Sequence, residues 1–283
     1  MDTEAEAIAD LAQRADTITV VPHELGPSVL VTDGELAVTD LEGLLPIPRR
    51  PTGTVKVLGE ASFVHAVNRW GDDATTTVYV DTARKQMTAV LNDVKPDSIP
   101  GWRDWRVVYT VPISEAFAPW VDADGALVGQ VDFAQFIEEN MGAVAEPAGR
   151  DLYAIVTTLE GSVEATWKHR HRDADGSRTF HYAEESTAAA GEAGDLTVPP
   201  TFTLVVPVFE GGEPREIVAK LRYRVNGGKL LLGFVLTGLG EIVRDEFQAA
   251  VERVQDGLDE DAAGEVLLAE APAVQSPRVA PVP

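Results

Sequence analysis

The clearest pattern of apolar and polar positions runs from Thr201 to Leu236, and it predicts an antiparallel meander of three strands. Residues 201–208 are almost wholly apolar, which is typical of a strand buried on both faces. Residues 217–225 instead alternate between apolar and mostly charged side chains, so we expect one buried and one exposed face. Residues 229–236 return as the third strand after Asn226-Gly227, a pair that favours a type I′ hairpin turn.

The exposed side of the middle strand carries Lys220, Arg222 and Arg224. In a chain with so many acids, three cations on one strand face are a candidate contact strip. They could bind phosphate or the acidic groups of a neighbouring subunit. The alternative is a solvated sheet face whose cations pair with local carboxylates, which is common for such strands.

Helical spacing of apolar residues appears in four further stretches. These predict helices at Glu60–Trp70, Phe133–Asn140, Arg150–Leu159 and Glu241–Leu258. We expect Asp132 to cap the second of them and Gly161 to end the third. Residues 1–16 are acidic and amphipathic, and they predict an N-terminal helix.

Strand signals surround these helices. Short strands are expected at Ile18–Val21, Ser28–Val31 and Arg106–Val111, and a hairpin at Thr75–Val80 with Gln86–Leu91. Trp102 and Trp105 flank the turn before the strand at residues 106–111. The two indoles could stack a base or a sugar, and the alternative is that they anchor the core.

A second hairpin is predicted from Ser162–Arg172 and Arg178–Glu184. On its strands, His169, His171 and His181 could share one face and hold a metal ion. The sequence places no carboxylate obviously beside them as a further ligand, so we favour another interpretation. The same ribbon carries Lys168, Arg170 and Arg172, which form a second candidate strip for contact with an acidic subunit.

These elements predict an α+β fold, with antiparallel sheets built from hairpins and a C-terminal meander, and with several short helices packed on them. We expect one domain over residues 17–258, organised as one unit or as two lobes. Residues 259–283 are acidic and then rich in Ala and Pro, and they predict a disordered tail.

Composition narrows the function. The 283 residues include 23 Lys and Arg but 46 Asp and Glu, for a formal net charge of -23. Such a charge repels nucleic acid and anionic membranes, so we expect direct binding to neither. The absence of cysteine removes disulfides, thiolate nucleophiles and iron–sulfur clusters. The start of the chain does not read as a signal peptide, and no apolar run reaches the length of a membrane span, so we expect an intracellular soluble protein.

No phosphate-binding glycine loop, dinucleotide fingerprint, nucleophile elbow or His-Glu-x-x-His pattern occurs. The sequence therefore assigns no catalytic residue, no cofactor and no metal. This lowers the odds of an enzyme without excluding one.

Three segments nevertheless resemble a known family. They are the helix FVHAVNRW at residues 63–70, the helix DFAQFIEEN at residues 132–140, and the strand PPTFTLVVPVF at residues 199–209. Together with the order of the elements, they make residues 5–255 resemble the YfdQ family of phage and prophage proteins. That family has no agreed catalytic residues. The resemblance implies a phage-encoded protein in the cytoplasm of a bacterial host.

Three functions fit these observations. The first is a non-enzymatic structural protein that assembles with itself into a symmetric homo-oligomer, up to a closed shell or compartment. The second is an acidic interaction protein, either a DNA mimic or a modulator of DNA-processing enzymes, whose partner would be a basic host or phage protein. The third is a metal-binding module or enzyme that uses the three histidines.

Overall fold

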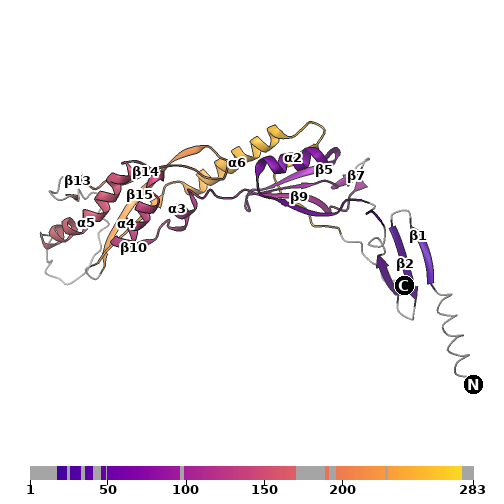
Figure 1. Cartoon of the computed structure of the whole chain (residues 1–283), viewed down its shortest axis with the longest axis horizontal. Coiled ribbons are helices and arrows are strands. Elements are labelled where there is room, and N and C mark those ends of the chain that lie inside the picture. Colours follow the sequence, from indigo (N-terminus) through magenta and orange to yellow (C-terminus); the bar gives the residue numbers. More distant parts are fainter. Residues whose placement is uncertain are drawn as a thin grey trace, which may run out of the picture.

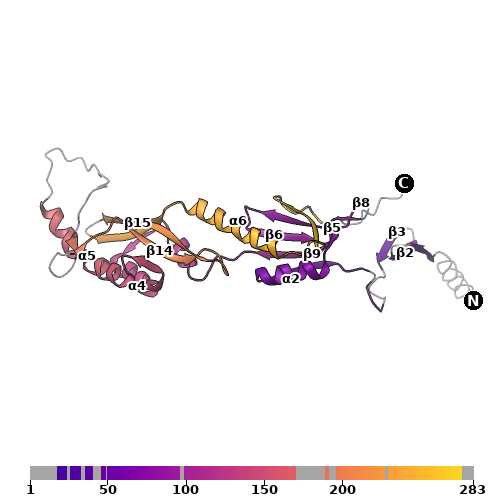
Figure 2. The same cartoon turned by 90° about the horizontal axis from the view of Figure 1, so that it is seen from above.

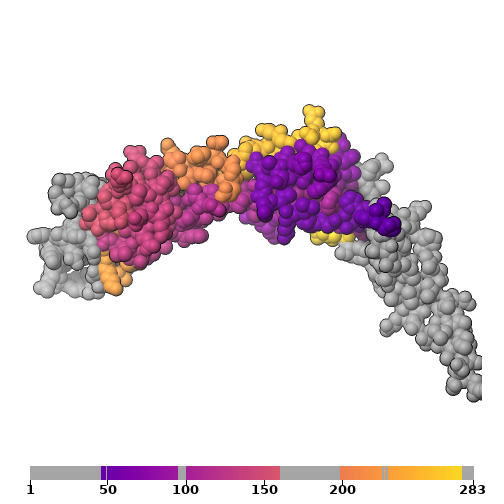
Figure 3. All heavy atoms as spheres, viewed as in Figure 1, coloured from indigo at the N-terminus to yellow at the C-terminus, as the bar shows by residue number. Residues whose placement is uncertain are grey.

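The computed structural model describes residues 18–23, 26–32, 36–40, 46–48, 50–95, 99–169, 189–190, 196–226 and 229–275. The fold is α+β, as predicted, and its two largest sheets lie one after the other along the long axis (Figures 1 and 2). We call the part formed by residues 50–110 and 239–275 the terminal lobe, and residues 111–236 the meander lobe. The two lobes give the surface an arched outline (Figure 3).

The terminal lobe contains a five-stranded mixed sheet with the order β17-β5-β6-β9-β4. Its strands are β4 (Gly53–Val57), β5 (Asp72–Asp81), β6 (Gln86–Val90), β9 (Trp105–Thr110) and β17 (Ala263–Leu267). The outer strands β4 and β17 run parallel to their neighbours, whereas β5, β6 and β9 pair antiparallel. The predicted hairpin of β5 and β6 is confirmed.

The meander lobe contains a five-stranded antiparallel sheet with the order β10-β16-β15-β14-β11. Its strands are β10 (Leu127–Gly129), β11 (Val144–Glu146), β14 (Thr201–Pro207), β15 (Pro214–Asn226) and β16 (Lys229–Leu236). The predicted meander of β14, β15 and β16 therefore forms the centre of this sheet, and two short strands extend it on either side.

Smaller pieces complete the strand inventory. β1 (Ile18–His23), β2 (Gly26–Thr32) and β3 (Leu36–Asp40) form a three-stranded antiparallel sheet. β7 (Val94–Lys95) pairs with β8 (Ile99–Pro100), and β12 (Ala189–Ala190) pairs with β13 (Leu196–Thr197). The strands expected at residues 18–21 and 28–31 are thus confirmed, whereas the helix expected at residues 1–16 lies outside the described residues.

The helices form where apolar residues recur at helical spacing. They are α2 (Glu60–Trp70), α3 (Ala118–Asp122), α4 (Gln130–Glu139), α5 (Gly149–His169) and α6 (Leu239–Gly257), with a 3₁₀ turn η3 (Met141–Ala143). In α2, for example, Phe63, Ala66 and Val67 are buried, and the Phe63 ring lies 6.2 Å from that of Tyr109 on β9. One stripe of each helix thus covers one face of a sheet.

Helix α6 joins the two lobes. Near its N-terminal half, Phe247 meets the Phe209 ring at 6.4 Å, and the Glu246 Oε1 accepts a 3.0 Å hydrogen bond from Arg215 of β15. Near its C-terminal end, Arg253 forms a 2.9 Å ion pair with Glu60 of α2. One helix therefore holds both lobes in a fixed relation, and its length along the molecule is visible in Figure 2.

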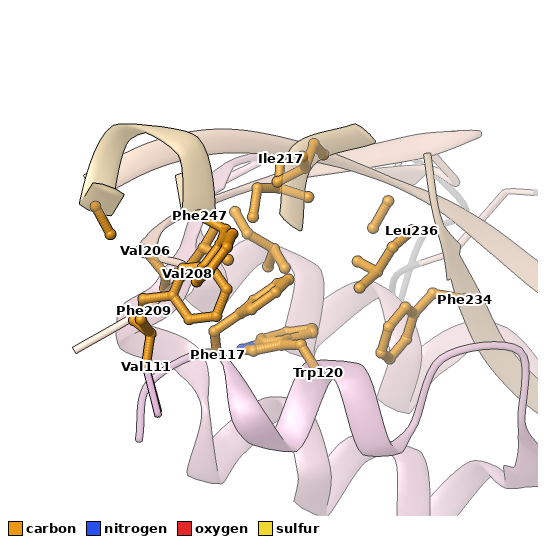
Figure 4. Packing of buried hydrophobic residues seen from close by; sticks show 14 of the residues in the cluster. Val111, Phe117, Trp120, Val206, Val208, Phe209, Ile217, Phe234, Leu236 and Phe247 are labelled. Carbon is orange, nitrogen blue, oxygen red and sulfur yellow. The ribbon is translucent and has the colours of Figure 1, made fainter. Parts of the chain in front are cut away.

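The apolar core runs without a break through the junction. Buried side chains from the inter-lobe segment, from the meander and from α6 meet there (Figure 4). The figure labels Val111, Phe117, Trp120, Val206, Val208, Phe209, Ile217, Phe234, Leu236 and Phe247. Backbone hydrogen bonds tie the inter-lobe segment to both sides, since Val111 N donates to Lys85 O at 2.9 Å and Ser114 N donates to Val208 O at 3.0 Å.

Helix α5 corrects two predictions. The backbone is helical from Gly149 to His169, so Gly161 does not end the helix, and residues 162–169 are not a strand. A glycine inside a helix costs only about 1 kcal/mol relative to alanine. In the sequence, Val163 follows Leu159 at the helical spacing of four residues, so the apolar repeat continues past Gly161. Residues 170–184, which complete the predicted hairpin, lie outside the described residues.

The strand β14 was predicted to be buried on both faces, and this is wrong. Phe202, Leu204 and Val206 are buried, whereas Val205 between them is 40% exposed. Helices cover only one face of the sheet, so the apolar residues on the other face remain accessible. Apolar runs alone cannot distinguish these two situations.

The region after α6 also differs from the prediction. Residues 263–267 form β17 rather than a disordered tail, and the described chain continues to residue 275. β17 approaches β5 closely at Gly264, where an added Cβ would lie 2.2 Å from the Asp73 carbonyl oxygen. Residues 276–283 lie outside the described part of the chain.

Two smaller corrections concern turns. Helix α4 starts at Gln130 with Gly129 in the capping position, so Asp132 lies in its first turn and does not cap it. Its carboxylate still suits the positive end of the helix dipole. Asn226 pairs with Lys229 and so belongs to the β15–β16 ladder rather than to the turn.

We predict that Gly233→Ala destabilises the protein by about 1–3 kcal/mol, because overpacking of a well-packed site costs that much. Gly233 lies on β16, and a Cβ there would come within 1.9 Å of the Ala126 carbonyl oxygen. Urea unfolding followed by circular dichroism measures the change. Gly240→Ala is the matched control, since its Cβ would meet nothing within 4 Å. Equal stability of both variants would contradict the prediction.

Candidate functional site

The strongest candidate site is the exposed face of the meander sheet. Its residues alternate with the buried ones along β14 and β15, because the sheet packs on helices from one side only. We define the outer face by the exposed residues Val205, Val218, Lys220, Arg222 and Arg224. Val205 is 40% and Val218 42% exposed, so the face is apolar as well as basic. It also carries one exposed acid, Glu216, directly opposite Val205.

The strand register places further side chains on this face. Lys220 pairs with Val235, Arg222 pairs with Gly233, and Gly233 in turn pairs with Leu127 of β10. Directly paired residues point to the same side of a sheet. Leu127, which is 38% exposed, therefore lies in the same row as Arg222. The prediction that Lys220, Arg222 and Arg224 share one exposed face of β15 is confirmed.

This face suits contact with another macromolecule. Exposed apolar residues gain free energy when covered, and the cations select a partner surface of opposite sign. Of its residues, arginine is among those enriched at protein interfaces.

Of the second predicted strip, only Lys168 lies within the described residues. The backbone at Lys168 is helical, near the end of α5, whereas Arg170 and Arg172 lie outside the described residues. The expected ribbon therefore does not begin on a strand, and the strip stays a prediction.

Of the three histidines proposed to hold a metal, only His169 lies within the described residues. His169 is the last residue of α5 rather than a strand residue, and His171 and His181 lie outside the described residues. The geometry that placed His169 and His171 on one strand face is therefore wrong at its first position. Within the described part of the chain, no group of three His, Cys, Asp or Glu side chains is placed to hold a metal.

A buried polar cluster was not predicted. Asp93, which is 4% exposed, accepts a 2.7 Å hydrogen bond from the Tyr79 hydroxyl and a 2.6 Å bond from Arg103 Nε. The Arg106 Nε donates to the Arg103 carbonyl oxygen at 2.7 Å. Arg103 has a φ of 59°, an unusual conformation that turns its side chain into the cluster. No sequence pattern pointed to it, because its members come from β5 and from the connection between β6 and β9.

A second layer of the same cluster fixes the connection between β6 and β9. Asp104 accepts two 2.6 Å hydrogen bonds from Arg50 and one of 2.7 Å from Asn92. The hydrogen bonds from Arg50 and the one from Asn92 hold the pKa of Asp104 below its usual range. The Arg50 guanidinium also lies 5.9 Å from the Trp102 ring.

The cluster ties Tyr79 of β5 to the connection that contains Asp93 and Arg103. Burial, and then the hydrogen bond to Asp93, raise the pKa of Tyr79 to about 12, so its phenol stays protonated near neutral pH. Trp105 contacts Trp70 with ring centroids 5.4 Å apart. Since Trp102 faces Arg50 while Trp105 packs on α2, the two indoles do not form one stacking platform.

Two shallow cavities flank helix α2, with volumes of 540 and 360 Å³. Both are lined by Ala61, His65 and Arg69. They are open to solvent, and Glu60, His65 and Asp259 bring titratable groups to the larger of them. In the described part of the chain, no helix is long and apolar enough to cross a membrane.

Comparison with known proteins yields one match. The model of an uncharacterized conserved protein family, DUF2303, covers residues 1–267. The match therefore includes β17, which lies beyond the region of sequence resemblance. No curated protein and no solved structure matches the chain.

We predict that Tyr79 makes stability fall at high pH. The pKa of Tyr79 is raised from 10.0 to about 12 in the folded protein. The stabilisation that this raised pKa provides is therefore fully present below pH 10. Between these values the unfolded chain loses the proton first, and the free energy of unfolding decreases. Tyr79→Phe should cost about 1 kcal/mol at pH 8 through the lost hydrogen bond. This deficit should shrink toward pH 12.

Urea unfolding at several pH values tests this, with Tyr223→Phe in the other lobe as the control. A deficit for Tyr79→Phe that does not change between pH 8 and the alkaline end would contradict the assignment.

Proposed function

The chain belongs to the uncharacterized conserved family DUF2303, and we propose that it is a non-enzymatic structural protein that assembles with itself into a symmetric homo-oligomer. The observation that carries the proposal is the outer face of the meander sheet. It combines half-exposed valines with Lys220, Arg222 and Arg224 on a subunit whose formal net charge is -23.

A second copy is the partner that best complements this face. Helix α6 presents exposed acids on the same subunit, among them Glu241, Asp245 and Glu252. A basic patch and an acidic helix at different places on one subunit favour a heterologous contact. Such contacts close into rings or shells when the rotation between subunits closes.

The biological context of this proposal comes from the sequence resemblance. We propose a phage-encoded protein that acts in the cytoplasm of a bacterial host, with a closed shell or compartment as its largest form. The acidic charge is consistent with a subunit that avoids nucleic acid and membranes. Nothing in this proposal requires a cofactor.

The acidic helix also supports a second candidate, an interaction protein that binds a basic host or phage protein, as a DNA mimic or a modulator of DNA-processing enzymes. Glu241, Asp245, Glu252 and Asp256 are exposed along α6 and could imitate the spacing of phosphates along a groove. This candidate uses the acids and leaves the outer face without a role, and we therefore place it second.

We predict a native particle several times heavier than one chain by light scattering at micromolar concentration. Lys220→Glu/Arg222→Glu should shift it toward the monomer, since like charges would then face the acidic partner surface. Raising the salt concentration to about 1 M should have the same direction of effect, because the Debye length falls to about 3 Å.

Lys56→Glu/Arg150→Glu is the matched control. It makes the same change in net charge at two exposed positions away from the outer face, and it should leave the mass unchanged. A monomeric wild-type protein would refute the proposal. An unchanged mass in the Lys220→Glu/Arg222→Glu variant would mean that the strip is a solvated face.

A further inference from the structure

One edge of the terminal sheet is open within the described part of the chain. Its last strand, β4, pairs with β9 on one side only. Gly53 N donates to Asp104 O at 2.6 Å, so the backbone groups of Gly53 face β9. These groups alternate along a strand, and those of Thr54 and Lys56 therefore face away from the sheet. Both residues are exposed, so β4 offers an open row of backbone donors and acceptors, which is a template for a further strand.

Helix α2 forms a groove beside this edge. Figure 2 shows the helix along one face of the terminal sheet, and the 360 Å³ cavity lies between it and β4. Val55 and Val57 line the cavity from β4, and Ala66 and Trp70 line it from α2. Trp70 is 39% exposed. A segment laid along β4 would therefore place every second side chain against an apolar surface.

The groove is basic although the chain has a formal net charge of -23. His65 and Arg69 line the 360 Å³ cavity, and no carboxylate is among its lining residues in the described part of the chain. Glu60 and Asp259 line only the neighbouring cavity of 540 Å³. Lys56 lies between the two valines of β4, so its exposed side chain points to the other face of the strand. Negative charge is thus favoured on both sides of an added strand.

We propose that this edge groove binds an extended segment of a partner protein, added as a strand beside β4, with apolar side chains at every second position and acidic side chains between them. The apolar side chains lie against Val55 and Val57, and the acidic ones lie beside Lys56. Main-chain hydrogen bonds to the edge supply affinity, and the alternating side chains supply specificity. A helix could not use the open backbone of β4, which is why the occupant is extended.

This site goes beyond the proposed homo-oligomer. It lies in the terminal lobe, whereas the outer face lies in the meander lobe, and one chain supplies all of it. A monomeric protein that binds such a segment would refute the homo-oligomer and leave the edge groove standing. An oligomer that binds none would do the reverse.

Fluorescence anisotropy with the full-length chain tests the proposal. The probe is a fluorescein-labelled peptide of alternating valine and glutamate that spans the five residues of β4. We expect saturable binding, and we expect the matched peptide of alternating valine and lysine to bind about tenfold more weakly, because like charges would meet. No binding of the valine–glutamate probe would overturn the proposal. That outcome includes a groove already filled by another segment of the chain or by a second copy.

Methylated probes test the backbone pairing. In a bound strand, alternate N–H groups point toward β4 and away from it. Two further probes carry N-methyl groups on all glutamates or on all valines. We expect one pattern to weaken binding about tenfold through lost hydrogen bonds, and the other to leave it nearly unchanged. Equal losses for the two patterns would exclude an added strand.

A charge reversal locates the probe on the protein. Lys56→Glu should weaken binding of the valine–glutamate probe about tenfold and strengthen binding of the valine–lysine probe. Arg150→Glu is the matched control, since it makes the same change in net charge at an exposed position of the meander lobe. It should leave both affinities unchanged. Equal effects of the two substitutions would mean that overall charge governs binding, and would overturn the edge groove.

Discussion

The structure depends on the contact that α6 makes with both lobes through a single apolar core. Phe247 packs on Phe209 at the end of the meander, while Val251 and Val254 are buried further along the same helix. The segment around Val111 also links the lobes, since Val111 N donates to the Lys85 carbonyl oxygen at 2.9 Å. A rigid relation between lobes is what a repeating assembly requires, because the geometry of each contact must be the same in every copy.

Local pattern predicted those elements whose burial is one-sided and regular. The helix at Glu60–Trp70 and the exposed cations of β15 follow directly from the spacing of their residues. The pattern could not show which sheet face a partner element covers, so β14 was assigned two buried faces. Local pattern also does not predict pairing between segments that are far apart in the sequence. β17 follows an acidic stretch of the sequence, and it forms a strand by pairing with β5.

The candidate site was predicted in part for the same reason. The outer face is a property of one strand, and alternation was enough to find Lys220, Arg222 and Arg224. The cluster around Asp93 needs Tyr79 from one strand, Arg103 from a connection and the backbone strain at that arginine. No spacing rule brings these residues together. Resemblance to a family without known chemistry added context but no site.

In each large sheet, helices cover one face. The opposite face is covered in one sheet and exposed in the other, and this difference favours assembly. In the terminal lobe the face opposite the helices is covered by residues 268–275, and Val90 is completely buried there. In the meander lobe the corresponding face leaves Val205 and Val218 about 40% exposed among the described residues. A chain that covers one sheet with its own backbone but leaves valines beside three cations on the other has a surface suited to another molecule. Since the chain also carries exposed acids along α6, we propose that a second subunit covers this surface.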